Sequence, residues 1–332
     1  MKLVTFQVGK KLHVGAVQSE WVVDIGAAIS ALKQRKVPRK LAGQSGFKDA
    51  ARTVLGAGPV PRDMIDLLER GEPWRQALAE VLAGLVGALD PERAPRRLLA
   101  PLESAKLLAP IPRPSKIVCV GRNYAEHARE RGAEIPTQPI FFLKSANTLC
   151  GPDDPIALPP NSTQVDYEAE FAVVMGEGGK RIPEEKAYEH IAGYTILNDV
   201  SARDMQRDDK QWFRGKSCDT FAPTGPWLVT RDEIPDPHSL QISLTLNSQT
   251  MQDSNTRSMI FRIPYLVSYL SQSLTWEAGD LLSTGTPEGV GAQRTPPVFL
   301  KSGDTVSVTV ERIGTLTNPV AGVSMALGAS VA

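Results

Sequence analysis

Short apolar runs bounded by turn residues recur along most of the chain and predict β-strands. The first 30 residues read as short strands joined by tight turns, and polarity alternates across residues 12–17. The same pattern returns after residue 115. The strands predicted in that later part lie at residues 116–120, 139–143, 167–175, 194–197, 239–246 and 305–310.

Helical patterns are fewer. Residues 62–70 are followed by Gly71, and glycine is the residue type most common just past a helix end. Residues 73–89 begin with proline and carry leucine and valine at helical spacing, which gives one apolar face. Further helices are predicted at residues 123–131, 184–192 and 264–272. Many strands with scattered helices predict an α+β fold that is mostly β, a mixed roll or barrel rather than a doubly wound sheet.

A proline-rich stretch divides the sequence. Six prolines lie from Asp90 to Pro114, a density typical of an extended connector. We therefore predict a small N-terminal α+β domain over residues 1–110, a linker at about 90–114, and a larger domain over residues 115–332.

Charge and composition narrow the class of partner. Lysine and arginine number 37, as do aspartate and glutamate, so the balanced charge offers no basic surface to nucleic acid or an anionic membrane. No stretch approaches the roughly 20 apolar residues of a membrane span, and the N-terminus lacks the apolar core of a signal peptide. The three cysteines lie in no metal-like pairing, which indicates free thiols in a reducing compartment. These features predict a cytoplasmic protein that binds a small molecule, with neither nucleic acid nor membrane as partner.

Three carboxylates are candidates for a metal site. Glu168 and Glu170 precede the apolar half of a predicted strand, and alternate residues of a strand point to the same face. The alternative is a solvated face with two ordinary surface glutamates. Asp199 lies where another apolar strand ends, and its alternative role is that of a helix cap. Together the three would form an oxygen-only site that suits Mg²⁺ or Mn²⁺, whereas zinc is disfavoured because neither cysteine nor histidine accompanies the set.

A histidine and a glutamate are spaced to share one helical face. Asn123 and Glu126 resemble a capping box, so a helix is predicted to begin there, and His127 and Glu130 are then i and i+3. A carboxylate that orients an imidazole makes it a general base able to deprotonate water. The alternative is a surface ion pair. The histidines that adjoin no plausible reaction site are His13, His190 and His238.

Two other segments carry candidate groups. Lys216 offers a cation for a carboxylate or a developing oxyanion, although an exposed loop lysine is the commoner role. Residues 283–291 form a glycine-rich turn whose free backbone N–H groups could hold an anionic substrate, although such turns are common.

Taken in order, these segments resemble the fumarylacetoacetate hydrolase family. The resemblance covers about residues 116–322, and its several ordered motifs make it specific. The matching segments are Gly121-Arg122-Asn123-Tyr124 with His127, Asp166-Tyr167-Glu168-Ala169-Glu170, Asn198-Asp199-Val200-Ser201-Ala202-Arg203-Asp204, Arg214-Gly215-Lys216-Ser217, Ser258-Met259-Ile260-Phe261 and Thr284-Gly285-Thr286-Pro287-Glu288-Gly289-Val290-Gly291. The resemblance implies the family's mixed β-roll and a homodimer.

The resemblance also implies roles for individual residues. The residues that match ligands of Mg²⁺ or Mn²⁺ are Glu168, Glu170 and Asp199. Those that match catalytic groups are His127, Glu130 and Lys216, the first two as the water-activating pair. Those that match substrate contacts are Arg203, Gln206, Lys216 and Thr286. One departure is that Val120 stands where the animal enzyme has an additional aspartate ligand. The three carboxylates would then be the only protein ligands, as they are in the bacterial and acylpyruvase-like branches of the family.

These observations predict a metal-dependent hydrolase that cleaves a C–C bond in a β-diketone or acylpyruvate-type substrate, such as fumarylpyruvate. A decarboxylase of oxaloacetate type and an isomerase of 2-hydroxyhepta-2,4-diene-1,7-dioate type are alternatives, because the same enolate-stabilising metal serves each and the fold cannot choose among them. A non-catalytic metal-binding module fits less well, because a binder needs no base such as the His127–Glu130 pair. The expected partner is a small oxo acid.

Overall fold

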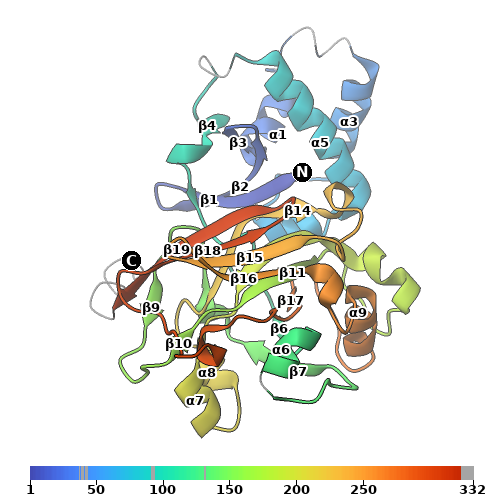
Figure 1. Cartoon of the computed structure of the whole chain (residues 1–332). Coiled ribbons are helices and arrows are strands. Elements are labelled where there is room, and N and C mark those ends of the chain that lie inside the picture. Colours follow the sequence, from blue (N-terminus) through green and yellow to red (C-terminus); the bar gives the residue numbers. More distant parts are fainter. Residues whose placement is uncertain (37, 39–40, 42–43, 91–93, 131, 323–332) are drawn as a thin grey trace.

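The protein is described by a computed structural model that covers residues 1–36, 38, 41, 44–90, 94–130 and 132–322. Strands and helices mix along the chain, and strands form most of its centre (Figure 1). The predicted α+β class with a mostly β content is confirmed.

The N-terminal part is the antiparallel end of a long sheet and the helices that cover it, drawn at the top of Figure 1. Its strands are β1 (Lys2–Val8), β2 (Lys11–Gln18), β3 (Trp21–Asp24), β4 (Leu99–Pro101) and β5 (Lys106–Leu107). Its helices are α1 (Ile25–Lys33), α3 (Ser45–Gly56), α4 (Met64–Leu68), α5 (Gly71–Ala88) and the short 3₁₀ turn η1 (Leu102–Ser104). The helices predicted at residues 62–70 and 73–89 are confirmed as α4 and α5, whereas α1 and α3 were not predicted.

The remaining strands form the rest of the molecule. They are β6 (Ile117–Gly121), β7 (Ile140–Lys144), β8 (Leu149–Cys150), β9 (Ile156–Leu158), β10 (Val165–Asp166), β11 (Ala169–Met175), β12 (Ile191–Asn198), β13 (Ser201–Ala202), β14 (Ala222–Thr230), β15 (Gln241–Leu246), β16 (Gln249–Asn255), β17 (Leu281–Ser283), β18 (Thr305–Val310) and β19 (Gly314–Gly322). The long sheet runs β4-β3-β2-β1-β14-β12-β11-β17-β6-β7, and a five-stranded sheet runs β16-β15-β18-β19-β9. Both sheets end in unpaired edges within the described residues, so the fold is a roll and not a closed barrel.

Short helices connect these strands. They are α6 (Ala125–Glu130), α7 (Arg203–Asp208), α8 (Phe213–Lys216), α9 (Ile263–Ser271) and the 3₁₀ segments η2 (Ala146–Thr148), η3 (Glu184–His190), η4 (Arg231–Glu233), η5 (Thr256–Ser258) and η6 (Gly291–Gln293). The helices predicted near residues 123–131 and 264–272 are confirmed as α6 and α9. The segment predicted as a helix at residues 184–192 is the 3₁₀ segment η3, while α7 and α8 were missed because each is too short for an apolar stripe to recur.

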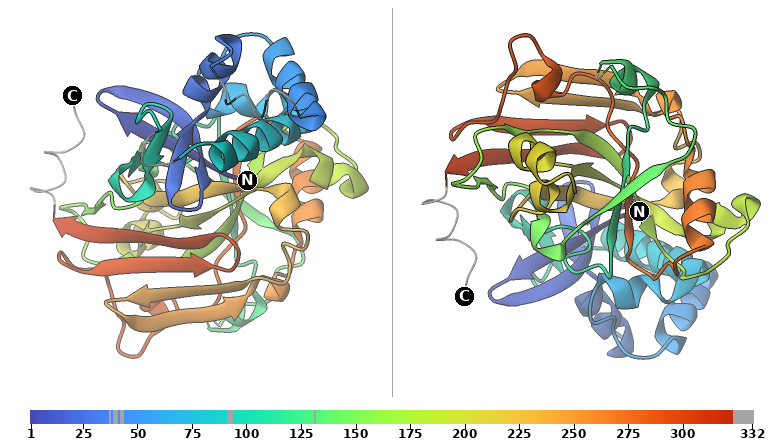
Figure 2. Two further views of the ribbon diagram at one scale, coloured as in Figure 1. Left: turned by 90° about the horizontal axis from the view of Figure 1, so that it is seen from above. Right: turned by 90° about the horizontal axis from the view of Figure 1, so that it is seen from below.

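Strand β11 lies at the centre and is buried on both faces. Its Phe171 and Val173 belong to the core shared with the five-stranded sheet, and the intervening Ala172 and Val174 belong to the core beneath the N-terminal helices. Figure 2 shows those helices and that sheet on opposite sides of the molecule. Burial on both faces explains why the strand is a continuous apolar run instead of an alternating one.

The long sheet crosses the predicted domain boundary. Lys2 and Leu3 of β1 pair with β14, and the amino group of Met1 donates to Thr230 Oγ1 at 2.5 Å. Strands β4 and β5, inside the proline-rich stretch, pair with β3 and β1. The division into residues 1–110 and 115–332 stays a prediction. The strand pairing between β1 and β14 connects the two predicted parts.

The buried His238 is expected to make the stability of the protein depend on pH. Burial, together with the charge of Arg262, lowers the pKa of His238 to about 4, and neither ring nitrogen has a hydrogen-bond partner within the described structure. The neutral form is therefore favoured by folding, so this stabilisation is complete above the unfolded pKa of about 6.5 and is lost as the pH falls toward 4.

We expect acidification from pH 7.5 to 5 to lower the free energy of unfolding by about 2 kcal/mol more in the parent than in His238→Gln. Urea unfolding at the two pH values measures this difference. Equal losses in the two proteins would show that His238 is not buried as a neutral group.

Candidate active site

The three predicted carboxylates come together where β11 and β12 lie side by side. The antiparallel register places Ala169 opposite Asn198, so the residues flanking this pair, Glu168 and Asp199, are neighbours. The Asp199 N–H donates to the Glu168 carbonyl at 2.9 Å, and the Glu168 N–H donates to Asn198 Oδ1 at 3.0 Å. Glu168 precedes β11 instead of lying inside the predicted strand, and Asn198 holds it in place.

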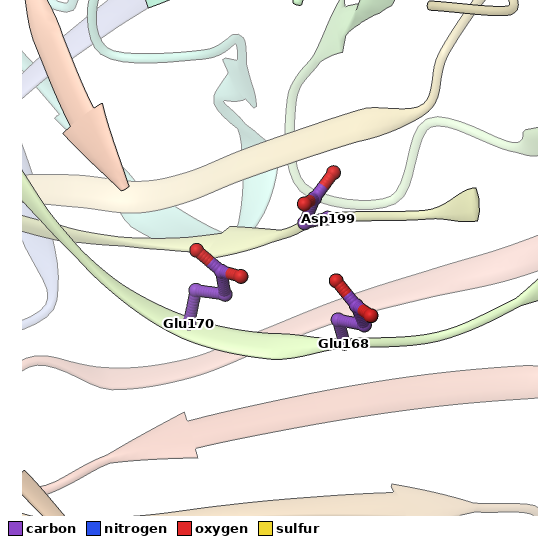
Figure 3. Close-up of side chains that lie close together, drawn as sticks. All are labelled: Glu168, Glu170 and Asp199. Atoms are coloured by element: carbon purple, nitrogen blue, oxygen red, sulfur yellow. The ribbon is translucent and has the colours of Figure 1, made fainter. Parts of the chain in front are cut away.

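Glu168, Glu170 and Asp199 each offer a carboxylate oxygen, and these atoms lie within 4.8 Å of one another. Figure 3 shows Glu168 and Glu170 projecting from one strand toward its neighbour, from which Asp199 projects in the same direction. All three side chains are buried, at 4%, 1% and 0% exposed. The alternative in which Glu168 and Glu170 are ordinary glutamates on a solvated strand face is therefore wrong.

Electrostatics indicate an excess of negative charge around Glu170. Burial and the negative charges of Asp199 and Glu168 raise the pKa of Glu170 well above its usual range. A hard divalent cation prefers oxygen ligands and supplies positive charge that would stabilise the ionised form of Glu170. The residues present therefore fit a divalent cation.

Three buried cationic side chains, those of Lys216, Lys144 and Arg203, donate hydrogen bonds to carboxylates of this site. Lys216 Nζ donates to Glu168 at 2.7 Å and to Asp199 at 2.6 Å, and Lys144 Nζ donates to Asp199 at 2.6 Å. Arg203 donates to Glu168 at 2.6 Å and to Asp166 at 2.8 Å. Although burial opposes it, the charges of Arg203 and Lys216 hold the pKa of Glu168 well below its usual range.

The formal charges of this network do not cancel. Three buried carboxylates, those of Asp166, Glu168 and Asp199, contact three buried cations. The fourth carboxylate, that of Glu170, accepts from Ser283 Oγ and the Gly285 N–H and forms none of these ion pairs. Lys144 and Asp166 were not predicted as site residues. Lys144 ends an apolar strand, a position where a fully buried lysine signals a charged partner, but the sequence does not name that partner.

His127 and Glu130 lie on α6, as predicted, and His127 lines a cavity together with Glu168 and Glu170. His127 is 3% exposed, and its Nδ1 lies 3.5 Å from Glu130 Oε2. The Glu130 carboxylate accepts the Gly289 N–H at 3.1 Å, which ties α6 to the glycine-rich turn. The pair is not an exposed surface pair, because the imidazole is buried.

The predicted capping box is wrong. Asn123 uses its amide to join three segments, donating to the carbonyls of Phe261 and Thr284 and accepting the Phe261 N–H. Glu126 instead pairs with Arg129 on the helix surface. Asn123 therefore fixes the turn that precedes α6.

One cavity collects most of the predicted groups. The predicted site residues that line it are His127, Glu168, Glu170, Gln206, Lys216 and Thr286. Arg122 and Trp212 also line it and were not predicted as site residues. Arg203 is not among the described residues of this lining, because its guanidinium donors bind Asp166, Glu168 and Gln206.

Gln252 is a further residue that the sequence did not indicate. Its side chain accepts the Ala169 N–H at 2.9 Å and donates to Thr286 Oγ1 at 2.9 Å. It thereby joins the start of β11, which carries the candidate ligands, to the glycine-rich turn. A buried glutamine within a strand is the only hint in the sequence, and it does not say which segments are joined.

The site thus combines an acidic cluster that fits a divalent cation with a buried histidine in one cavity of a mostly β roll. The family model described as fumarylacetoacetate (FAA) hydrolase C-terminal matches residues 116–321. The chain therefore belongs to the fumarylacetoacetate hydrolase family and is an enzyme of that family.

Named relatives add detail. The chain is 45% identical over 263 residues to "Oxaloacetate tautomerase FAHD2A, mitochondrial" of Bos taurus, covering 79% of this chain and 80% of that protein. It is 44% identical over 278 residues to "Oxaloacetate tautomerase YisK" of Bacillus subtilis (strain 168), covering 82% of this chain and 91% of that protein. Among solved structures, a maleylpyruvate hydrolase from Sphingobium sp. SYK-6 in complex with manganese(II) ion and pyruvate superposes with a TM-score of 0.70 at 28% identity, covering 97% of this chain and 99% of that one.

Within the described residues, no helix is both long and apolar enough to cross a membrane. The location in the cell and the homodimer stay predictions.

Proposed function

We propose that the protein interconverts the keto and enol forms of a 2-oxo dicarboxylic acid of the oxaloacetate type, with the help of a divalent cation. The observation that carries this proposal is a buried imidazole, His127, that shares one cavity with Glu168, Glu170 and the ammonium group of Lys216. The similarity to proteins named oxaloacetate tautomerases supports the same chemistry. Among the reactions considered from the sequence, the oxaloacetate-type alternative is the most similar to this function. We therefore prefer it to C–C hydrolysis, which was the main prediction from the sequence.

A bound divalent cation supplies a Lewis acid that polarises a 2-oxo group and stabilises an enolate. Mg²⁺ and Mn²⁺ both suit an oxygen-only ligand set, and Mn²⁺ is the first choice for experiments because a structural neighbour holds manganese(II).

The protein's own groups then move one proton. His127 accepts the proton from C3 of the keto form and returns it either to that carbon or to the oxygen on C2, which gives the enol. Glu130, 3.5 Å away, stabilises the imidazolium that exists between the two transfers. Lys216, held by Glu168 and Asp199, offsets negative charge on the C2 oxygen.

Hydrolysis of an acylpyruvate C–C bond is the second candidate. The same His127–Glu130 pair can activate water, and the Sphingobium neighbour is named a maleylpyruvate hydrolase. Tautomerisation needs only a base and an enolate-stabilising site, whereas hydrolysis also needs a positioned water molecule.

A comparison of three reactions tests the proposal. With Mn²⁺ present, ketonisation of enol-oxaloacetate is followed by ultraviolet absorbance, decarboxylation by pyruvate release, and hydrolysis by loss of acetopyruvate and fumarylpyruvate. We expect ketonisation to be the fastest reaction and to fall to the spontaneous rate after chelation. If acylpyruvate cleavage is faster and ketonisation stays at the spontaneous rate, the proposal is wrong and C–C hydrolysis is the function.

A further inference from the structure

The cavity has one cation for which the described protein supplies no anion. Lys216, the other permanently charged cation in its lining, is bound to Glu168 and Asp199. Arg122 also lines the cavity, but the described structure gives its side chain neither a hydrogen bond nor an ion pair, and its Nε is buried without a partner. A guanidinium N–H that is buried without an acceptor is costly, so a ligand carboxylate would stabilise Arg122.

The backbone holds Arg122 in an unusual conformation. Its φ of +57° lies in the left-handed region, which residues other than glycine seldom adopt. Both neighbours are fixed. A Cβ on Gly121 would lie 2.7 Å from the Trp212 ring, and the Asn123 amide is bound to Phe261 and Thr284. A strained conformation that is fixed from both sides is typical of a residue that must present its side chain at a site.

We infer that Arg122 binds the second carboxylate of the substrate, the one remote from the 2-oxo acid end, and thereby selects dicarboxylic over monocarboxylic 2-oxo acids. This inference rests on the proposed function for the nature of the substrate. A guanidinium presents a planar fork that matches a carboxylate with two parallel hydrogen bonds, which a lysine cannot do. Arg203 does not compete for this role, because its donors are bound within the acidic network.

Malate and lactate provide a test that needs no turnover. They are the 2-hydroxy counterparts of oxaloacetate and pyruvate, they differ by one carboxylate, and neither enolises. Calorimetric titration of the Mn²⁺-loaded protein should give at least tenfold tighter binding of malate than of lactate. Equal affinity for the two ligands in the parent protein would overturn the inference whether or not any variant folds.

Variants assign the preference to Arg122. In Arg122→Gln, malate affinity should fall on the order of 10- to 100-fold, while lactate affinity changes less than about threefold, because one charge-assisted pair is lost. Arg122→Lys should retain part of the preference. Arg129→Gln is the control, since Arg129 lies on the exposed surface of α6 and pairs with Glu126. Loss of affinity for both ligands alike, or for neither, would contradict the inference.

These results separate the inference from the proposed function. If ketonisation of oxaloacetate fails but malate binding depends on Arg122, the dicarboxylate site stands and the reaction is a different one. If ketonisation succeeds and Arg122→Gln leaves the preference for malate unchanged, the reaction stands and this role of Arg122 is wrong.

Discussion

Replacing His127 by glutamine is expected to lower the rate of keto–enol interconversion of oxaloacetate on the order of 10²–10⁴-fold, the typical contribution of a general base. The imidazole is 3% exposed and lines the same cavity as the metal-binding candidates. Glutamine keeps a polar side chain of similar length but cannot accept a proton at neutral pH. Stopped-flow ultraviolet absorbance with saturating Mn²⁺ measures the rate in parent and variant.

Two comparisons make this result specific. Glu130→Gln should also slow the reaction, because the imidazolium loses the carboxylate 3.5 Å from its Nδ1. Metal-assisted decarboxylation of oxaloacetate needs no base and should change little in either variant. His190→Gln serves as the control, since His190 bonds the Glu177 carbonyl outside the cavity. An unchanged ketonisation rate in His127→Gln would make the His127–Glu130 pair structural and remove the proposed proton transfer.

The sequence predicts the site best where its geometry depends on local spacing. Glu168 and Glu170 are two residues apart, and His127 and Glu130 are three apart on a helix, so each pair was predicted to share a face. Asp199 required a further step, because a strand end says only that the residue is near a sheet edge. The register between β11 and β12 brings it to Glu168.

Contacts between distant segments could not be predicted in this way. Lys144 and Asp199 are 55 residues apart, and Asn123 bonds Phe261 and Thr284 across 138 and 161 residues. Their partners depend on sheet order, which periodicity does not specify. The family resemblance implies a substrate contact for Arg203, and this role stays a prediction, although its guanidinium donates to Asp166, Glu168 and Gln206.

The fold shows the same division. The strand predicted from an apolar run at residues 167–175 is confirmed as β11. The sequence does not reveal that β1 pairs with β14, because this pairing joins residues more than 200 positions apart.

Replacing Glu170 by glutamine is expected to weaken Mn²⁺ binding by more than the roughly 10–100-fold that loss of an outer-shell partner costs. Glu170 is 1% exposed, and its carboxylate is oriented by Ser283 Oγ at 2.5 Å and by the Gly285 N–H at 3.0 Å. Glutamine retains the shape of the side chain and removes the negative charge, so the change tests the ligand itself. Glu177→Gln is the matched control, because Glu177 is exposed just beyond the end of the same strand.

Calorimetric titration with Mn²⁺ tests the central claim, that Glu168, Glu170 and Asp199 bind one divalent cation. The account predicts one Mn²⁺ per chain in the parent and in Glu177→Gln, with affinity more than about 100-fold weaker in Glu170→Gln. Equal Mn²⁺ affinity in the parent and in Glu170→Gln, or no binding in the parent, would contradict it.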